Sequence, residues 1–115
     1  MKVFLSLPMS GRTDEEINNQ IKEMTEAVEN HFVIDRYLVI HDNFDYKPTT
    51  LLESDPVTIP LLYLGQAIKK IGMCDAVVFG ENWERARGCR IEFLVAKEYD
   101  VPIYFMDGDR LRPGE

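Results

Sequence analysis

The sequence predicts an α/β fold, a three-layer sandwich in which helices cover both faces of a parallel sheet of four or five strands. Short apolar runs alternate along the chain with longer runs of helical period. Strands that alternate with helices pair in parallel through right-handed crossovers, which bring the helices onto the faces of the sheet. The 115 residues fit one domain, which we expect to span residues 1–115 with 108–115 as a tail.

The first predicted strand and helix lie near the N-terminus. Residues 2–8, KVFLSLP, are a short apolar run that ends in turn residues, as expected of a buried parallel strand. Residues 13–30 have helical period, and Thr13 with Glu16 matches a capping box at the start of this helix. One face of the helix is apolar and is expected to point inward: Ile17, Ile21, Met24 and Val28.

The middle of the chain predicts a second strand, a long loop and a second helix. The strand lies within residues 32–40, and residues 41–56 are rich in turn and breaker residues. Loops of that length are uncommon in small domains and are often functional. Residues 59–72 have helical period and end at Gly72, with an apolar stripe of Leu61, Leu64, Ile68 and Ile71.

The last third of the chain predicts two strands around a third helix. Residues 75–81, DAVVFGE, and residues 102–107, PIYFMD, are short apolar runs typical of buried strands. Between them, residues 88–101 contain a helix whose inward residues are expected to be Ile91, Leu94 and Val95.

Composition and charge exclude several classes of protein. Hydrophobic residues make up 45% and charged residues 29% of the chain, which is typical of a soluble globular protein. No apolar run approaches the ~20 residues that cross a bilayer, and the N-terminus lacks the pattern of a signal peptide. We therefore expect no membrane partner.

The net charge of −7 argues against binding to a nucleic-acid polymer, which needs a basic stripe. It leaves room for a small nucleotide beside a few arginines that are close together. Two cysteines, Cys74 and Cys89, are too few for a disulfide framework or a zinc site. A reducing, cytoplasmic location is therefore predicted.

The sheet geometry selects where functional side chains are expected. In open α/β sheets, ligands bind outside the carboxyl ends of the strands, where the strand order reverses. Three segments follow predicted strands and fall at this edge, namely residues 8–13, 41–46 and 80–92.

The first of these segments reads LPMSGRT with its neighbours. Ser10 and Arg12, together with backbone N–H groups at a helix start, could hold a phosphate or a sugar hydroxyl, and Gly11 permits a tight turn. The lysine of a triphosphate-binding loop is absent. A plain strand-to-helix turn with a helix cap explains the same residues.

The second segment, HDNFD, offers Asp42 and Asn43 as possible contacts to a sugar hydroxyl. His41, Asp42 and Asp45 could resemble metal ligands, but no known ligand spacing is completed. A solvated loop is the alternative. The sequence predicts neither a metal site nor a cofactor.

The third segment contains Glu92, for which two interpretations stay open. A carboxylate near the start of a helix interacts favourably with the helix dipole, worth ~0.3–1 kcal/mol. However, Glu92 lies between Ile91 and Phe93, near the buried edge of the helix, at the edge of the sheet where a ligand is expected. A partly desolvated carboxylate in such a place can serve as a nucleophile or a general base.

Three arginines, Arg85, Arg87 and Arg90, raise the positive charge beside Glu92. They are a reasonable anion site for a 5′-phosphate, with ion pairs to Glu81 and neighbouring acids as the alternative.

Three other residues have both a functional and a structural interpretation. Trp83 could stack on a nucleobase or could pack its loop onto the core. Asp75 begins the third strand, where a turn cap is the plain explanation. Cys89, at a helix start near arginines, could be an activated thiol but fits a small packed residue better.

At these residues the sequence resembles a known group. KVFLSLPMSGRTDEEI, and the run from LLYLGQAIKK through WERARGCRIEFLVAKEYDVPIY, resemble a small uncharacterised family of bacteria and phages that is related to the nucleoside 2-deoxyribosyltransferases. The resemblance covers residues 2–106. It implies a single nucleoside 2-deoxyribosyltransferase-like domain with a flavodoxin-like sheet. The shared pattern includes an Asp at the start of the third strand and a Gly-x-x-x-Glu helix start, here Gly88 to Glu92.

This resemblance implies Glu92 as the nucleophile. In the characterised enzymes this glutamate attacks the anomeric carbon, the nucleobase leaves, and a new base or water resolves the covalent deoxyribosyl-enzyme. It further implies Asp75 close to the sugar, and a homo-oligomer in which a neighbouring subunit helps complete the site. The turn of residues 10–12 and the loop before Glu92 are implied to bind sugar or phosphate.

The chain also departs from the characterised enzymes. They carry a tyrosine near the nucleophile where this chain has Phe4, a glycine where it has Leu7, and an Asp or Ser where it has Glu84. A hydroxyl that would orient the carboxylate is thus missing at Phe4.

The expected function is that of a 2-deoxyribosyltransferase or N-glycoside hydrolase acting on a nucleoside or a nucleoside 5′-monophosphate. A non-catalytic nucleotide-binding module of the same fold, such as a phage protein that sequesters a nucleotide, is the second hypothesis. A structural or interaction protein is the third. Glu92 is expected in a pocket at the carboxyl ends of the strands, near Ser10 and Gly11.

Overall fold

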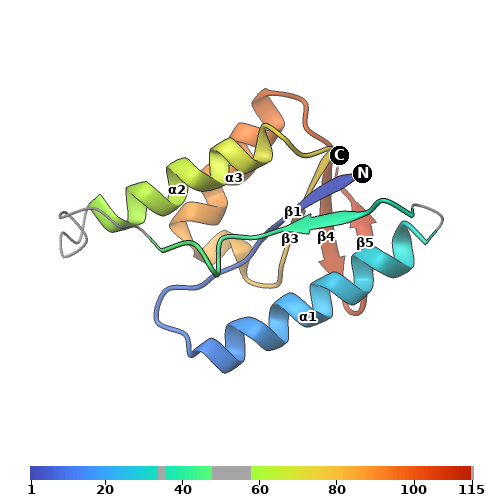
Figure 1. Cartoon of the computed structure of the whole chain (residues 1–115), viewed down its shortest axis with the longest axis horizontal. Helices are drawn as coiled ribbons and strands as arrows, with labels where there is room; N and C mark the ends of the chain where they lie inside the picture. The colour runs from blue at the N-terminus through green and yellow to red at the C-terminus, as the bar shows by residue number, and fades with distance from the viewer. Residues whose placement is uncertain (34–35, 48–57, 115) are drawn as a thin grey trace.

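A computed structural model describes residues 1–33, 36–47 and 58–114 of the chain. Five strands form one sheet in the order β2-β1-β3-β4-β5, and three α-helices flank it (Figure 1). In chain order the elements are β1 Lys2–Ser6, α1 Asp14–His31, β2 Val39–His41, α2 Thr58–Ile71, β3 Ala76–Phe79, the short 3-10 helix η1 Trp83–Arg85, α3 Arg87–Glu98, β4 Ile103–Asp107 and β5 Arg110–Pro113.

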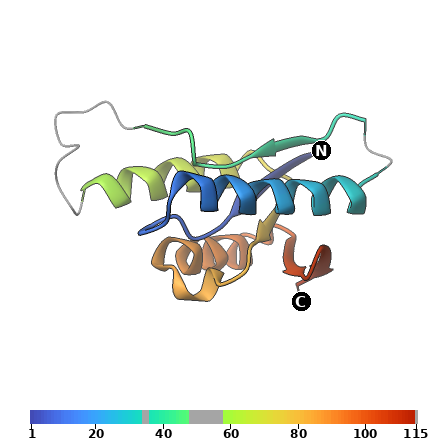
Figure 2. The same ribbon diagram turned by 90° about the horizontal axis from the view of Figure 1, so that it is seen from below.

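The sheet is mostly parallel and has a layer of helix on each face. β1 pairs in parallel with both β2 and β3, and β3 pairs in parallel with β4. Helix α1 lies on one side of the sheet, and α2 and α3 lie on the other (Figure 1). The edge strands are β2 and β5 (Figure 2). This mixed α/β arrangement is consistent with the predicted three-layer sandwich.

Alternation along the central strands creates two hydrophobic cores. In β1, Val3 and Leu5 face α1, whereas Phe4 and Ser6 face the opposite side, because successive side chains of a strand point to opposite faces. The first core also contains Ile17, Met24 and Val28 of α1. The second contains Val77, Phe79, Ala67, Ile71 and Ala96.

The predicted start of α1 is confirmed. The hydroxyl of Thr13 accepts a hydrogen bond from the backbone N–H of Glu16 (3.2 Å), and the Thr13 N–H donates to the Glu16 carboxylate (3.1 Å). The expected inward face of this helix is also confirmed, with Ile17, Met24 and Val28 buried and Ile21 packed against them. Glu16 has a lowered pKa, chiefly because its carboxylate accepts the backbone hydrogen bond from Thr13.

The predicted inward faces of α2 and α3 are wrong in part. Leu61 and Leu94 are 58% and 55% exposed, and Ile68 is also exposed. The residues that meet the sheet include small ones, Ala67 in α2 and Ala96 in α3. A small side chain lets a helix lie close to a sheet, so the largest apolar residues of a helix do not always mark its buried face.

The predicted C-terminal tail is also wrong in part, because residues 110–113 form β5, antiparallel to β4. Gly108 turns the chain with a φ of 65°. Leu111 is buried in the α1-side core while Arg110 and Arg112 are exposed, which is the alternation of a half-buried edge strand. Of the predicted loop at 41–56, residues 48–56 lie outside the described residues.

The neighbouring strands β1 and β3 mark where the chain changes direction across the sheet. The chain leaves β1 into α1 on one face and leaves β3 into α3 on the other face. Their carboxyl ends are joined by the Gly80 N–H, which donates to the Ser6 carbonyl (2.8 Å). The segments that follow, residues 7–13 and 80–86, therefore start side by side. Across the described residues, no helix is long and apolar enough to cross a membrane.

Candidate functional site

A buried hydrogen bond joins Glu92 to the end of β1. The hydroxyl of Ser6 donates to Oε2 of Glu92 at 3.3 Å. Ser6 and Glu92 are 1% and 8% exposed. Because Ser6 is the last residue of β1, this pair places the carboxyl group at the carboxyl edge of the sheet, on the side covered by α2 and α3.

Ser6 was not among the residues singled out from the sequence. It stands two residues after Phe4 and therefore on the same face of β1. Its hydroxyl donates to the carboxyl group of Glu92, as the hydroxyl missing at Phe4 would. The signal in the sequence was a lone polar residue at an inward position at the end of an otherwise apolar strand.

Burial dominates the ionisation of Glu92. It raises the pKa of this carboxyl to about 7, and the hydrogen bond from Ser6, which favours the charged form, opposes the rise. Nearby, burial raises the pKa of the Cys89 thiol to about 11, against an opposing interaction with Ser6. The Cys89 thiol is thus protonated at neutral pH, which agrees with a small packed residue rather than an activated thiol.

The helix dipole does not explain Glu92. Helix α3 begins at Arg87, so Glu92 is its sixth residue and lies beyond the first turn. The dipole effect falls off within the first turn. Cys89, Glu92 and Ala96 form the buried face of α3, so Glu92 occupies a core position in place of an apolar side chain.

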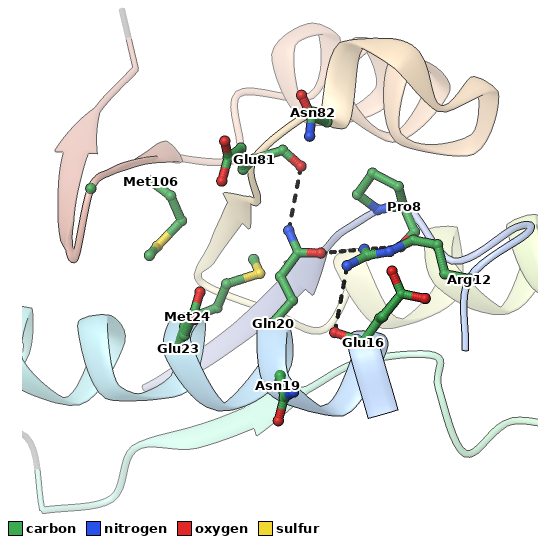
Figure 3. A pocket seen from close by; sticks show the side chains of 11 residues that line it. Pro8, Arg12, Glu16, Asn19, Gln20, Glu23, Met24, Glu81, Asn82 and Met106 are labelled. Carbon is green, nitrogen blue, oxygen red and sulfur yellow. Dashed lines mark hydrogen bonds between the residues drawn. The ribbon is translucent and has the colours of Figure 1, made fainter. Parts of the chain in front are cut away.

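Arg12 is held in place by its neighbours, as Figure 3 shows. Its guanidinium donates to the Pro8 carbonyl (2.7 Å) and to Oε1 of Gln20, while Nε2 of Gln20 donates to the Glu81 carbonyl (3.3 Å). Gln20 therefore ties the first predicted segment to the third. It was missed from the sequence, although it stands one turn from Ile17 and Met24 on the inward face of α1.

The turn before α1 is formed as a strand-to-helix turn. Gly11 has a φ of 73°, a conformation that favours glycine, and the Arg12 N–H donates to the Met9 carbonyl (3.3 Å). Ser10 and Gly11 are exposed. Ser10 and Gly11 lie in the exposed turn after the carboxyl end of β1, whereas Glu92 is buried in the core.

A cavity of about 460 Å³ opens on the α1 side of the carboxyl edge (Figure 3). We call it the α1-side cavity. Glu92 does not line it. Acidic side chains outnumber the one arginine around it, and the lining residues are Pro8, Arg12, Glu16, Asn19, Gln20, Glu23, Met24, Glu81, Asn82, Met106 and Gly108. The sheet separates this cavity from Glu92. The carboxyl edge therefore has two separate candidate sites, the α1-side cavity and the Ser6–Glu92 pair on the side of α2 and α3.

Gly80, directly after β3, faces α1 and has no room for a side chain. A Cβ at Gly80 would lie 2.6 Å from Nε2 of Gln20 and 2.9 Å from the sulfur of Met24. The backbone at the end of β3 thus approaches α1 closely, which is what allows Gln20 to reach the Glu81 carbonyl.

The segment after β2 lies against α2. Asn43 is 7% exposed, and its Nδ2 donates to the Tyr63 carbonyl (3.0 Å). Asp42 closes a turn by accepting from the Phe44 N–H (2.8 Å), and Lys70 donates to the Asp42 carbonyl. Within the described ranges, no group of three His, Cys, Asp or Glu side chains could hold a metal ion.

Two of the arginines before Glu92 point into solvent. Arg85 and Arg87 are exposed, and with the other described residues they form no ion pair. Arg90 donates to the Glu84 carbonyl (3.0 Å). The described part of the chain therefore does not support the alternative in which these arginines serve to neutralise Glu81 and its neighbours.

Trp83 packs on the core. Its ring lies 4.9 Å from that of Phe93, 5.2 Å from Phe79 and 5.6 Å from Phe105, where it is stacked. These contacts fix η1 against the sheet and match the structural interpretation of Trp83. The ring remains half-buried.

Asp75 lies at the other end of the sheet. Its carboxylate accepts a hydrogen bond from the Lys2 N–H (2.8 Å), which places it at the start of β1 and β3. Ser6 and Glu92 lie at the carboxyl ends of the same strands. A single chain therefore does not bring Asp75 together with Glu92.

Comparisons with known proteins identify the family. Neither the curated proteins nor the solved structures include a match to the chain, and nothing found links it to the nucleoside 2-deoxyribosyltransferases. A family model, described as a domain of unknown function (DUF4406), matches residues 1–105. This match spans nearly the whole chain, and the chain therefore belongs to the DUF4406 family.

Proposed function

We propose that this protein cleaves or transfers the N-glycosidic bond of a nucleoside or nucleoside 5′-monophosphate, with Glu92 as the nucleophile. The observation that supports this most directly is the buried Glu92 carboxyl group, oriented by the Ser6 hydroxyl at the carboxyl edge of the sheet. The protein would be more stable with an apolar side chain at this buried position of α3. A buried ionisable group is therefore a candidate functional residue.

The strand order supports the location of the site. The order β2-β1-β3-β4-β5 matches the strand order of flavodoxin-like sheets, although the edge strand β5 is antiparallel, and this match supports the proposed location. Such sheets bind ligands at the switch point between β1 and β3. Ser6 ends β1 at this point, and Glu92 hydrogen-bonds to it.

The proposed chemistry has two balanced steps. A carboxylate oxygen of Glu92 forms a bond to the anomeric carbon while the carbon–nitrogen bond breaks, and its electron pair leaves with the base, which takes a proton from solvent. Water, or a second base, then attacks the same carbon. The ester bond breaks, the carboxylate of Glu92 is restored, and the proton of the attacking group returns to solvent.

A non-catalytic nucleotide-binding module is the second candidate function. It is favoured by the position of the α1-side cavity, which Glu92 does not line. In this alternative a nucleotide binds at the carboxyl edge without reaching the carboxyl group of Glu92. Arg12 is the arginine that lines the α1-side cavity, whereas the exposed Arg85 and Arg87 supply positive charge for a phosphate beside α3.

The decisive experiment is a base-release assay with deoxyribonucleosides, ribonucleosides and their 5′-monophosphates. Release of free base from a member of this panel supports the proposal. Binding in calorimetry without release supports the second candidate. A result with no base release and no binding for any member of the panel would contradict both candidates.

Ser6→Ala is expected to move the pH dependence of base release upward. The Ser6 hydrogen bond lowers the pKa of Glu92, so its loss raises that pKa and leaves less carboxylate at neutral pH. A hydrogen bond to a charged group contributes about 1.5 kcal/mol or more, so the midpoint of kcat/KM against pH should rise by about one unit. Ser6→Thr retains the hydroxyl and should retain the midpoint. An unchanged midpoint in Ser6→Ala would show that Ser6 does not act on the catalytic group.

Gly88→Ala is expected to lower base release without lowering stability. Gly88 and Glu92 share a face of α3, so a ligand that reaches Glu92 is expected to approach Gly88, where an added side chain would obstruct it. Within the protein, a Cβ at Gly88 meets nothing within 4 Å, so packing does not require glycine there. Alanine should stabilise the helix by up to about 1 kcal/mol. Gly65→Ala is the matched control, because Gly65 in α2 also has free space around it. Equal activity in both variants would mean that no ligand approaches Gly88.

A further inference from the structure

Two polar atoms are left without partners at the end of β2. Oδ1 of Asn43 and Nε2 of His41 are buried, and neither has a hydrogen-bond partner in the part of the chain that the structure describes. Leaving a buried polar atom unpaired costs about 1–3 kcal/mol, so each such atom asks for an explanation. Neither atom is used by the proposed chemistry at Glu92.

The orientation of the Asn43 amide is fixed. Its Nδ2 donates to the Tyr63 carbonyl of α2 (3.0 Å), which leaves Oδ1 as an acceptor. An acceptor buried in this way needs a donor from outside the described residues. A ligand with a hydroxyl or amine group can supply it.

The sheet register brings Asn43 to the neighbourhood of Ser6. His41 of β2 pairs with Phe4 of β1, and Asn43 and Ser6 each follow two residues later. Both lie on the α2 and α3 side, since Asn43 contacts α2 and Ser6 contacts Glu92 of α3. Asn43 lies in the bend that follows β2, so its amide and the hydrogen-bonded Ser6–Glu92 pair belong to neighbouring segments on the same side of the sheet, at its carboxyl edge.

We propose that Oδ1 of Asn43 accepts a hydrogen bond from a ring hydroxyl of the sugar whose anomeric carbon faces Glu92, so that Asn43 selects the sugar of the substrate. This assignment rests on the proposed function. A sugar hydroxyl is the group that fits, because it donates a hydrogen bond and lies within a few bonds of the anomeric carbon. Both the 2′- and the 3′-hydroxyl meet this requirement.

Equilibrium binding with sugar analogues tests the assignment. In a Glu92→Gln background, which is not expected to turn over, calorimetry compares the four common ribonucleosides and their 5′-monophosphates with the 2′-deoxy, 3′-deoxy and 2′,3′-dideoxy forms. An analogue that lacks the hydroxyl donating to Oδ1 of Asn43 should bind about tenfold more weakly than its parent. In a protein that also carries Asn43→Ala, the same analogue should bind within about twofold of its parent.

The matched control is Asn19→Ala, which removes an exposed amide from the α1-side cavity. It should leave the discrimination between parent and analogue intact. If Asn19→Ala removes the discrimination and Asn43→Ala does not, the ligand occupies the α1-side cavity and the assignment is wrong. If the protein that retains Asn43 binds the parent compound and all analogues equally well, the assignment of Asn43 is also wrong.

A measurement on the intact protein covers the case in which Asn43→Ala does not fold. The side-chain amide resonances of Asn43 in ¹⁵N-labelled protein should shift with the parent compound and stay in place with the dideoxy form. This separates the two proposals: binding that depends on Asn43 without base release contradicts only the catalytic one. Base release that ignores the sugar hydroxyls contradicts only the assignment of Asn43.

Discussion

Glu92→Gln is expected to reduce kcat/KM for base release on the order of 10³-fold or more, the scale seen when the nucleophile of an enzyme is removed. Glutamine has nearly the same shape and can still accept a hydrogen bond from Ser6, so the fold around it should persist. Its amide oxygen is a far weaker nucleophile than a carboxylate. Steady-state release of free base, measured with the best substrate of the panel, gives the comparison.

The control for this variant is Glu98→Gln, at the exposed end of the same helix. It makes the same chemical substitution on the same helix and should leave kcat/KM unchanged. The wild-type protein adds a second test, because a nucleophile acts in its ionised form. With the pKa of Glu92 near 7, kcat/KM should fall about tenfold per pH unit below about pH 7. A profile that rises toward acid pH would instead identify Glu92 as a proton donor.

Much of the fold could be predicted because its signals are local. The capping box of Thr13 and Glu16 depends on residues three apart, and the period of α1 follows from a short window of sequence. The apolar runs of β1 and β3 have the same local character. The carboxyl edge as the place for a site followed from the alternation of these elements.

The buried faces of α2 and α3 depend on what the sheet presents to them, and periodicity alone did not find them. Leu94 was expected inside and is exposed, whereas Glu92 was weighed as a helix-dipole carboxylate and is in the core. Ala96 allows the close approach that decides between these faces. A small side chain contributes little to a hydrophobic pattern, so its importance appears only in the packed structure.

Side-chain partners between distant segments were the least predictable feature. Nothing in the sequence pairs Ser6 with Glu92, which lie 86 residues apart, or Gln20 with the Glu81 carbonyl. Each pair exists because two strand ends and two helices meet at one edge of the sheet. Asp75 shows the converse, since its place at the start of a strand put it at the edge opposite Glu92.

The second large effect concerns stability against pH. Native Glu92 has a pKa of about 7, against about 4.5 for an exposed glutamate. Between these pH values the native state holds a proton that the unfolded state has released, so the free energy of unfolding falls as pH rises. The contribution of Glu92 is complete below pH 4.5 and lost above about pH 7, a change of about 3 kcal/mol.

Glu92→Gln should lack this slope. Denaturant unfolding of both proteins from pH 4 to pH 8.5 is expected to show the variant gaining about 3 kcal/mol on the wild type as pH rises. Lowered pKa values, such as that of Glu16, give slopes of the opposite sign in both proteins and cancel in the difference. Parallel stability curves would mean that the Glu92 carboxyl ionises as freely in the native state as in the unfolded chain. A variant that is more stable at pH 8 and inactive would show that the chain keeps a destabilising carboxylate for its chemistry.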